Sequence, residues 1–484
     1  MTEYQNPQND PGAQKRLMLA FLLVFVMIAA MRFLMPSPPP PQQPQQTPTP
    51  QQQASPTGTT GAPPAAATTP KPAPAAAPKV AVKQAAAESE SVLENESYRI
   101  VFTNHGAVAK SWVLKNYKDE KGRPLDLVNS LAAPVLGHPL SFFAYDKDLE
   151  KKLNEAMYVV GAQSVPGAIT YEYSDGEITA RKTLRTDQAY VIALETEVTR
   201  NGQRVTAFPQ WPGGLGDQTS LSGFAASRLD WYLDGNVERN TPTSGWFLTG
   251  GKKWVADGKT LNGPFQWAGL GDRYFFAAFM PQSPKDTTLV TLNSPLEVPK
   301  DPSNPNDTAK EKVAALGLAF GHTTGLTRVR VFAGPKAVDV LDNTHAQPGG
   351  PDLRATLDFG FFGFIARPLF LWLRWTYLHW IPNWGWAIAF LTVVITMALL
   401  PLRVASMKSS LKMQKIQPQV KAITEKYKRY SITDPRRQEM QKEMSELYKK
   451  EGVNPVGGCF PMLLQMPFLF AFYSMLGNVI DLRL

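Results

Sequence analysis

Two long stretches without charged residues constrain this chain more than any other feature. Residues 384–402 and 456–480 contain no Asp, Glu, Lys or Arg, and about 20 apolar residues suffice for a helix to cross a bilayer. The second stretch is opened by NPVGGCFPMLLQMP at residues 454–467, which places Gly, Pro and Gln465 where an ordinary span has aliphatic side chains. Such residues are tolerated in a span where they face protein or water. The sequence therefore predicts membrane helices with a polar side that does not face lipid.

A basic segment between these two stretches sets the expected orientation. Residues 403–451 contain 13 Lys and Arg against six Asp and Glu, and such an excess beside a span indicates the cytoplasmic side. Nucleic-acid binding is the competing interpretation, but no RNA- or DNA-binding motif accompanies the charge. We expect a cytoplasmic helical hairpin over residues 403–455 that turns near residues 431–434 and serves either self-packing or docking. Apolar residues recur in it at helical steps of three and four: Met413, Ile416, Val420, Ile423 and Tyr427.

The N-terminal region has the pattern of an anchor followed by a tether. Lys15 and Arg16 precede residues 17–35, which consist of an apolar run at 17–31, Arg32 and three further apolar residues. This segment is either a cleaved signal peptide or a retained transmembrane helix. No convincing small-residue cleavage site follows, so we expect a retained anchor with residues 1–16 in the cytoplasm. Residues 36–90 are rich in Pro, Ala and Gln. This composition cannot form a core and predicts an extended linker.

A large soluble domain is expected over residues 91–352. Its segments alternate polar and apolar residues or are rich in β-branched ones, and Gly and Asn-containing turns separate them. No alternation of strands with helices is seen, which favours an antiparallel β-sandwich. Topology would place this domain outside the cytoplasm. The clearest predicted strands are residues 98–103, 107–114, 178–186, 190–199 and 326–332.

An aromatic segment at residues 358–381 precedes the first charge-free stretch. Arg367 and Arg374 are seven residues apart in it and so share one helical face. This predicts an amphipathic helix lying in the membrane interface. The alternative, a tilted transmembrane helix, would bury both arginines at about 2.5–3.5 kcal/mol each.

Catalytic and cofactor motifs are absent from the sequence. The five histidines are scattered without metal-ligand spacing, and Gly251 stands where a phosphate loop at residues 245–251 would require Lys. Cys459 is the single cysteine, so no internal disulfide forms. We therefore expect no enzyme, no metal site and no cofactor.

Polar residues inside the expected spans form the candidate site instead. Thr392, Thr396 and Arg403 follow one another at i, i+4 and i+11, on one helical face, and Gln465 supplies an amide on the next span. A threonine hydroxyl can also bond back to its own helix, which would make each threonine unremarkable when taken singly. Together these four residues predict a shared polar surface that contacts substrate.

Several motifs in residues 358–484 resemble the YidC-type membrane protein insertases. The anchor, linker and β domain are similar to the Gram-negative form of this family, whose periplasmic domain is a β-supersandwich similar to sugar-mutarotase folds. The fold class implied is a multi-domain membrane protein, with an α-helical transmembrane region, a large antiparallel β-sandwich in the periplasm and a cytoplasmic helical hairpin. The motifs are Asn-Trp-Gly at 383–385, Pro-Leu at 401–402, Lys-Met at 412–413, Gln-Pro at 417–418 and NPVGGCFPMLLQMP at 454–467.

The resemblance implies an insertase and chaperone. Its hydrophilic groove, open to the cytoplasm and to lipid, would guide hydrophobic segments of nascent proteins into the bacterial inner membrane. It would act alone or with the Sec translocon. The basic hairpin, where it does not serve self-packing alone, is a candidate docking arm for a ribosome, a partner or a nascent chain. No nucleotide, cofactor or specific nucleic-acid sequence is implied. The resemblance divides the helical region into an interfacial helix at 358–381, transmembrane helices at 384–402 and 456–480, and the hairpin at 403–455.

The sequence departs from the family pattern in two respects. Thr392 and Gln465 match polar groove positions, but Thr396 stands where the family usually carries Arg, and we expect Arg403 to replace that arginine in part. Relatives continue with three more helices, so we expect this sequence to be truncated after the third span. The alternative functions are a membrane-anchored scaffold or sensor with an extracytoplasmic binding domain, and a sugar enzyme.

Overall fold

The structure is a computed structural model, which describes residues 81–119, 121–161, 166–242, 253–302, 308–346, 351–428, 430, 436–452 and 460–482. The expected anchor at residues 17–35, the turn at residues 431–434 and Cys459 lie outside these ranges. The chain divides into two compact units. One contains Ala76–Pro401 and Gln465–Leu484, and the other contains Leu402–Leu464 with the N-terminal residues.

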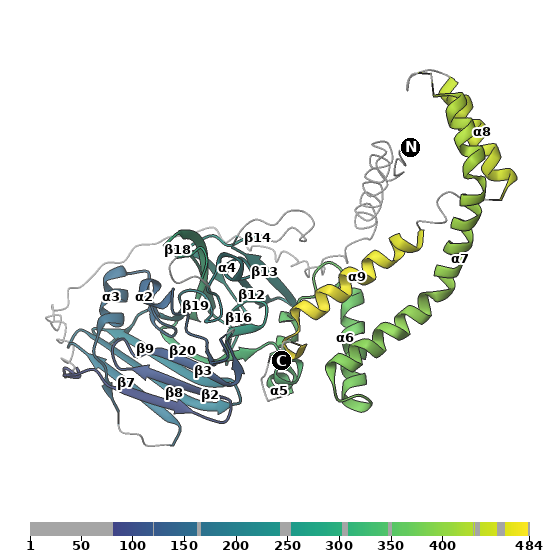
Figure 1. Cartoon of the computed structure of the whole chain (residues 1–484). Coiled ribbons are helices and arrows are strands. Elements are labelled where there is room, and N and C mark those ends of the chain that lie inside the picture. The colour runs from purple at the N-terminus through teal and green to yellow at the C-terminus, as the bar shows by residue number, and fades with distance from the viewer. Residues whose placement is uncertain are drawn as a thin grey trace, which may run out of the picture. The chain divides into compact units, whose positions relative to one another are not determined.

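The larger unit contains three β-sheets, and Figure 1 shows their strands in colours that run from purple through teal to green. Within the described residues, the largest sheet has the order β14-β13-β12-β16-β17-β20-β9-β8-β7-β6, with β10 paired to β9. The second has the order β15-β18-β19-β11-β5, and the third runs from β1 to β4. The strands are β1 Glu90–Glu94, β2 Tyr98–Thr103, β3 Val108–Lys118, β4 Pro124–Asp126, β5 Phe142–Phe143, β6 Val159–Val160, β7 Ala168–Ser174, β8 Ile178–Gln188, β9 Val191–Arg200, β10 Gln203–Arg204, β11 Phe208–Trp211, β12 Arg228–Leu233, β13 Asn236–Thr241, β14 Lys253–Trp254, β15 Lys259–Asn262, β16 Phe265–Gly271, β17 Phe275–Pro281, β18 Thr287–Pro299, β19 Lys310–His322 and β20 Leu326–Pro335.

Alternation of buried and exposed side chains produces these strands. In β8, Ile178, Ala180 and Leu184 are buried, while Arg181 and Arg185 are exposed. This period of two is the one that a half-buried strand requires. The described strand pairs are antiparallel except β13 with β14. The expectation of a large antiparallel sheet domain is therefore confirmed.

Aromatic side chains fill the space between the sheets. The Phe320 ring of β19 lies 6.1 Å from that of Phe265 and 6.2 Å from that of Phe279, which belong to the largest sheet. Trp112 of β3 and Trp211 of β11 have ring centroids 5.8 Å apart, and all these rings are buried. Sheets packed face to face through such side chains form a sandwich core.

Lys182 is a fully buried lysine in this core. Its Nζ donates to the backbone carbonyls of Ala107 and Leu140, each at 2.7 Å, and lies 4.4 Å from the centroid of the Phe142 ring. Both carbonyl residues have positive φ, 49° for Ala107 and 67° for Leu140, a conformation that non-glycine residues adopt at a cost. The lysine thus holds two unfavourable turns in place.

The stability of this domain is expected to depend on pH through Lys182. Burial lowers the pKa of Lys182 from 10.5 to about 7, so between these values the unfolded chain holds a proton that the folded chain lacks. The free energy of unfolding therefore rises with pH over this window, by up to about 1.4 kcal/mol per pH unit, and the full penalty is present below it. Denaturant unfolding of the purified protein at several pH values measures this slope. A Lys182→Met variant should show a smaller slope, and an equal slope would contradict the assignment.

Along the chain, helices lie between some of these strands and after the last of them. Within the described residues, α7 is the one helix long and apolar enough to cross a membrane. The helices are α2 Ala133–Leu136, α3 Lys147–Glu155, α4 Leu221–Ala225, α5 Val338–Ala346, η3 Leu353–Thr356, α6 Gly363–His379, α7 Trp384–Lys426, α8 Arg436–Lys450, α9 Phe460–Asn478 and η4 Ile480–Leu482.

Three helices of the larger unit share an apolar core of their own. Helix α6 contributes Leu373, the first part of α7 contributes Leu391, and α9 contributes Met475, and all three side chains are buried in one cluster. Small residues, Ala387 of α7 and Ala471 of α9, are fully buried in the same cluster. Small side chains allow helices to approach closely, so this contact fixes α6, α7 and α9 side by side.

The smaller unit contains a helical pair. Helix α7 continues without a break past residue 402. Ile416 and Tyr427 in its last part and Met440 of α8 are buried. The Tyr427 hydroxyl donates to Glu443 at 3.0 Å, and Lys426 Nζ donates to the same carboxylate at 2.7 Å. The residues at the predicted steps of three and four are thus the less exposed ones of this part of α7.

Candidate functional site

The polar residues of α7 lie on its exposed surface. Thr392, Thr396 and Arg403 are all exposed, and α7 is helical through all three positions. The Thr392 hydroxyl donates to the carbonyl of Ile388 at 2.8 Å, which is the bond to its own helix that the sequence left open. Its oxygen still has lone pairs that can accept a hydrogen bond. The surface therefore offers acceptors at Thr392 and a cation at Arg403.

Gln465 lies on α9, in the larger unit with the two threonines, and is half-buried. Helices α7 and α9 meet through Leu391 and Ala471, and Thr392 directly follows Leu391 in the chain. The threonines thus flank the surface where α7 meets α9, while Arg403 belongs to the smaller unit. The shared polar surface predicted for all four residues stays a prediction.

Helix α6 differs from the expected interfacial helix in one of its two arginines. Arg367 is exposed, as the amphipathic pattern predicts. Arg374 instead contacts the carboxylate of Asp339, with Asp342 at 4.0 Å, and both acids belong to α5. One face of α6 is buried against α7 and α9. The exposed apolar side chains of α6 and its flanks are Phe361, Phe364, Leu371, Trp372, Trp375, Leu378 and Trp380.

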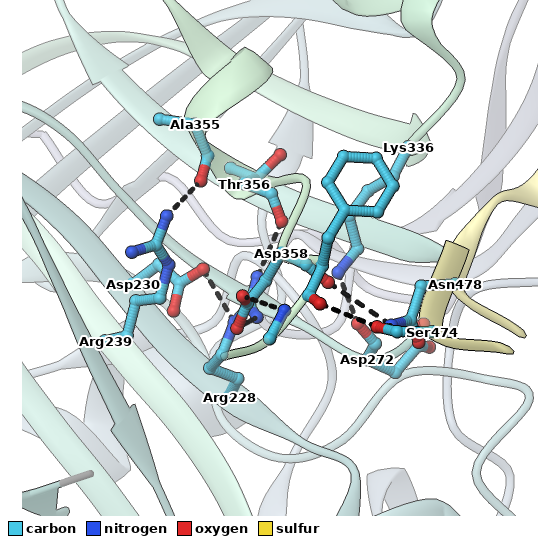
Figure 2. A network of polar contacts seen from close by, with 12 residues as sticks. Arg228, Asp230, Arg239, Asp272, Lys336, Ala355, Thr356, Asp358, Ser474 and Asn478 are labelled. Carbon is cyan, nitrogen blue, oxygen red and sulfur yellow. Dashed lines mark hydrogen bonds and ion pairs between the residues drawn. The ribbon is translucent and has the colours of Figure 1, made fainter. Parts of the chain in front are cut away.

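A buried network of charges joins strands β12 and β13 to the segment that leaves the β domain (Figure 2). Arg228 of β12 pairs with Asp230 at 2.8 Å and with Asp358 at 3.0 Å, and it donates to the carbonyl of Thr356 at 2.6 Å. Arg239 of β13 donates to the carbonyl of Ala355 at 2.6 Å. Bonds with a charged donor are about twice as strong as neutral ones. Two arginines therefore hold residues 353–358, here called the exit segment, against the sheet.

Asp358, the last residue of the exit segment, and the adjacent Phe359 bond to α9. The Ser474 hydroxyl donates to the carbonyl of Phe359 at 2.7 Å, and the Asn478 amide donates to the carbonyl of Asp358 at 3.3 Å. Figure 2 shows both side chains on α9 reaching toward the chain that bears Asp358. The first residues after the β domain are thus bonded on one side to strands and on the other to a predicted membrane helix.

Burial shifts the pKa values of the charges in this network. It raises the pKa of Asp230 above its ordinary value, although Arg228 lies beside it and favours the ionised form. Burial, with repulsion from Arg228, lowers the pKa of Lys336 to about 8, and its Nζ donates to the carbonyl of Asp272. Removing one member would leave the others buried without a partner, which is costly.

No sequence motif singled out Arg228, Asp230, Ser474 and Asn478, which join the β domain to α9 and are here called the junction residues. Arg228 and Asp230 alternate with Leu229 and Trp231 and so share one face of β12, a pattern that is also typical of a solvated strand face. Ser474 and Asn478 stand at i and i+4 near the end of a charge-free stretch. Such a polar pair at the end of a span was the available signal.

Clustered metal ligands are absent from the described part of the chain. No group of three or more His, Cys, Asp or Glu side chains lies close enough there to hold a metal ion. The geometry instead combines a long apolar helix, hydroxyls on its surface, aromatic residues beside it and a rigid β domain.

Two family models match the chain. The model described as "YidC periplasmic domain" matches residues 90–372, and that described as "60Kd inner membrane protein" matches residues 375–484. The chain belongs to the YidC family of membrane protein insertases. This is not a family of enzymes, and its members are inner-membrane proteins.

Curated YidC proteins match most of the chain. The membrane protein insertase YidC of Endomicrobium trichonymphae is 30% identical over 414 residues, which are 82% of this chain and 68% of that protein. The YidC of Anaeromyxobacter dehalogenans strain 2CP-C is 31% identical over 415 residues, 82% of this chain and 70% of its own. The family resemblance inferred from the motifs is confirmed.

Solved structures from two groups of proteins also match parts of the chain. A crystal structure of an active YidC insertase with its first transmembrane domain resolved is 19% identical and covers 82% of this chain and 74% of its own, with a TM-score of 0.26. A galactose mutarotase-like protein from Lactobacillus casei ATCC 334 is 11% identical and covers 51% of this chain and all of its own (100%), with a TM-score of 0.31.

Proposed function

We propose that this chain is a membrane protein insertase that places the hydrophobic segments of nascent proteins into the bacterial inner membrane. The observation that carries the proposal is the match of relatives named as membrane protein insertases across 82% of the chain. Two features of the helices support it: the apolar helix α7 exposes Thr392 and Thr396, and α6 exposes an aromatic face. Aromatic side chains are enriched where a membrane meets water.

The mechanism follows from what polar groups cost in lipid. An unsatisfied polar group costs several kcal/mol in the bilayer core, so a groove with Thr392, Thr396 and Gln465 would offer bonds to the polar part of a substrate. Burial of the substrate's apolar segment supplies the driving force, about 0.3–0.6 kcal/mol per strongly apolar residue. No nucleotide is needed for either step, and a chaperone role follows from holding apolar segments before release.

The proposed topology has three spans, at residues 17–35, 384–402 and 456–480. The β domain lies in the periplasm, and the basic hairpin at residues 403–455 lies in the cytoplasm. The positive-inside rule supports this orientation. We also propose that the hairpin is the surface on which the ribosome docks, and that the protein acts alone or beside the Sec translocon.

Insertion into liposomes tests the proposed function. The purified protein is reconstituted, a single-span substrate is synthesised in its presence, and the substrate segment protected from protease is measured. Liposomes with the protein should protect several times more substrate than empty ones. Equal protection would favour the alternative, a membrane-anchored scaffold or sensor.

Arg403 is expected to favour substrates with acidic tails. An Arg403→Ala variant should insert such a substrate about two- to fivefold more slowly, because an exposed cation attracts acidic groups modestly and is screened by salt. Lys408→Ala, which removes another exposed cation of α7, is the matched control and should have a smaller effect. An unchanged rate for Arg403→Ala, or an equal loss for a neutral tail, would contradict this role.

A further inference from the structure

We propose that Ser474 and Asn478 are positioning residues that fix where α9 stands along its axis relative to the β domain and α6. The proposal rests on the proposed insertase function, because the position of α9 sets the position of the groove residue Gln465. Ser474 and Asn478 are one helical turn apart on α9, and the Asn478 amide also donates to the Ser474 hydroxyl at 3.2 Å. They therefore act as one polar pair.

The pair binds an anchor that is itself fixed. Its acceptors are the carbonyls of Asp358 and Phe359, just before α6 begins. The Asp358 carboxylate pairs with Arg228 of β12 and accepts from the backbone amide of Gly360 at 2.9 Å. Two carbonyls of the exit segment also accept hydrogen bonds from Arg228 and Arg239, each at 2.6 Å. The anchor thus cannot move without breaking charged bonds inside the sheet domain.

Apolar packing alone would leave the axial position of α9 poorly defined. Ala471 and Met475 contact α6 and α7 through hydrocarbon surfaces, and burial of such surfaces has no direction. Hydrogen bonds require donor and acceptor to meet within narrow limits of distance and angle. A slip of one turn, about 5.4 Å, would therefore break both bonds to the exit segment while the apolar contact could re-form.

Gln465 is carried by the same helix. At about 1.5 Å per residue it lies roughly 14 Å along the axis from Ser474. An axial shift of α9 at the exit segment would therefore move Gln465 along the helix axis and change its position relative to Thr392 on α7. The polar pair is in this way a positioning device for the groove and need not touch substrate.

The test compares the parent with a double variant, Ser474→Ala with Asn478→Leu. In a Cys459→Ser background, cysteines that carry spin labels replace Tyr473 and Lys285, which are both exposed. The distance between the two labels and the insertion rate are both measured in liposomes. We expect a narrow distance distribution in the parent. In the double variant we expect a broad or shifted distribution and at least about fivefold slower insertion. Ser474→Thr, which keeps the hydroxyl, should retain the parental distance and rate.

The outcomes separate the two proposals. A double variant with parental distance and parental rate would overturn the positioning role, and so would a slower rate at an unchanged distance or a shifted distance at an unchanged rate. Loss of strand signal in circular dichroism would show unfolding; the single variant Asn478→Leu then serves as a second variant, because it removes the amide donor without adding a charge and leaves the Ser474 bond in place. If the parent inserts nothing while its distance is narrow, the proposed function fails, and the positioning role that rests on it fails too.

Discussion

Replacing Arg228 with alanine is expected to lower the free energy of unfolding by about 3–5 kcal/mol, the range measured when one partner of a buried ion pair is removed. The side chain of Arg228 is 10% exposed and that of Asp230 is 0% exposed. The variant would leave the Asp230 carboxylate buried without its nearest cation and the carbonyl of Thr356 without its donor. Denaturant unfolding of the purified protein in detergent, followed by circular dichroism of the strands, measures the change.

Two further variants make this prediction specific. Arg328→Ala removes an arginine of β20 whose ion pair with Glu195 is exposed on both sides, and it should cause little measurable change. Arg228→Met with Asp230→Leu removes both buried charges and should recover part of the loss, because apolar residues of similar size replace a buried ion pair well. A loss for Arg228→Ala no larger than that for Arg328→Ala would show that the network does not stabilise the domain.

Removing the polar groups of the candidate groove should have the largest effect on insertion. Thr392→Val with Gln465→Leu keeps the shapes of both side chains and removes a hydroxyl and an amide. If each contributes a hydrogen bond of about 1 kcal/mol to the moving substrate, the rate should fall on the order of tenfold or more. Protease protection of a substrate in liposomes measures the rate.

Helix α7 offers a matched control for this experiment. The Thr424 hydroxyl donates to the carbonyl of Val420 at 2.8 Å, the same bond that Thr392 makes to Ile388. Thr424 lies in the hairpin part of the helix, so Thr424→Val removes an equivalent hydroxyl outside the candidate groove. It should insert at the parental rate. If the groove variant does so too, the Thr392 hydroxyl serves only its own helix.

The strands could be predicted because their signal is local. Residues 98–103 form β2 with the bounds that their alternation indicates, and residues 326–332 begin β20 as predicted. The order of strands in the sheets could not be predicted. β20 pairs with β9, in the register Leu326 to Glu197, and partners so distant in sequence leave no periodic signal in either strand.

The helices of the candidate site could be predicted from the sequence, but the contacts that join them to the β domain could not. A long charge-free stretch indicates α7 by itself. The pairing of Arg374 with Asp339 depends on α5 lying beside α6, which no pattern within either helix reveals. Arg228 likewise bonds to the exit segment, more than a hundred residues later in the chain, a contact that no pattern within β12 reveals.

The residues that join the β domain to α9 are synthesised in a fixed order. Arg228 and Arg239 are made first, then the exit segment at residues 353–358, and Ser474 and Asn478 last. Domains generally fold as units, N-terminal first, as the chain emerges. The arginines and the exit segment can therefore close on each other while α9 is still unmade. When α9 is synthesised, the two carbonyls that accept from Ser474 and Asn478 are already in place. The folded β domain therefore sets the position in which α9 assembles.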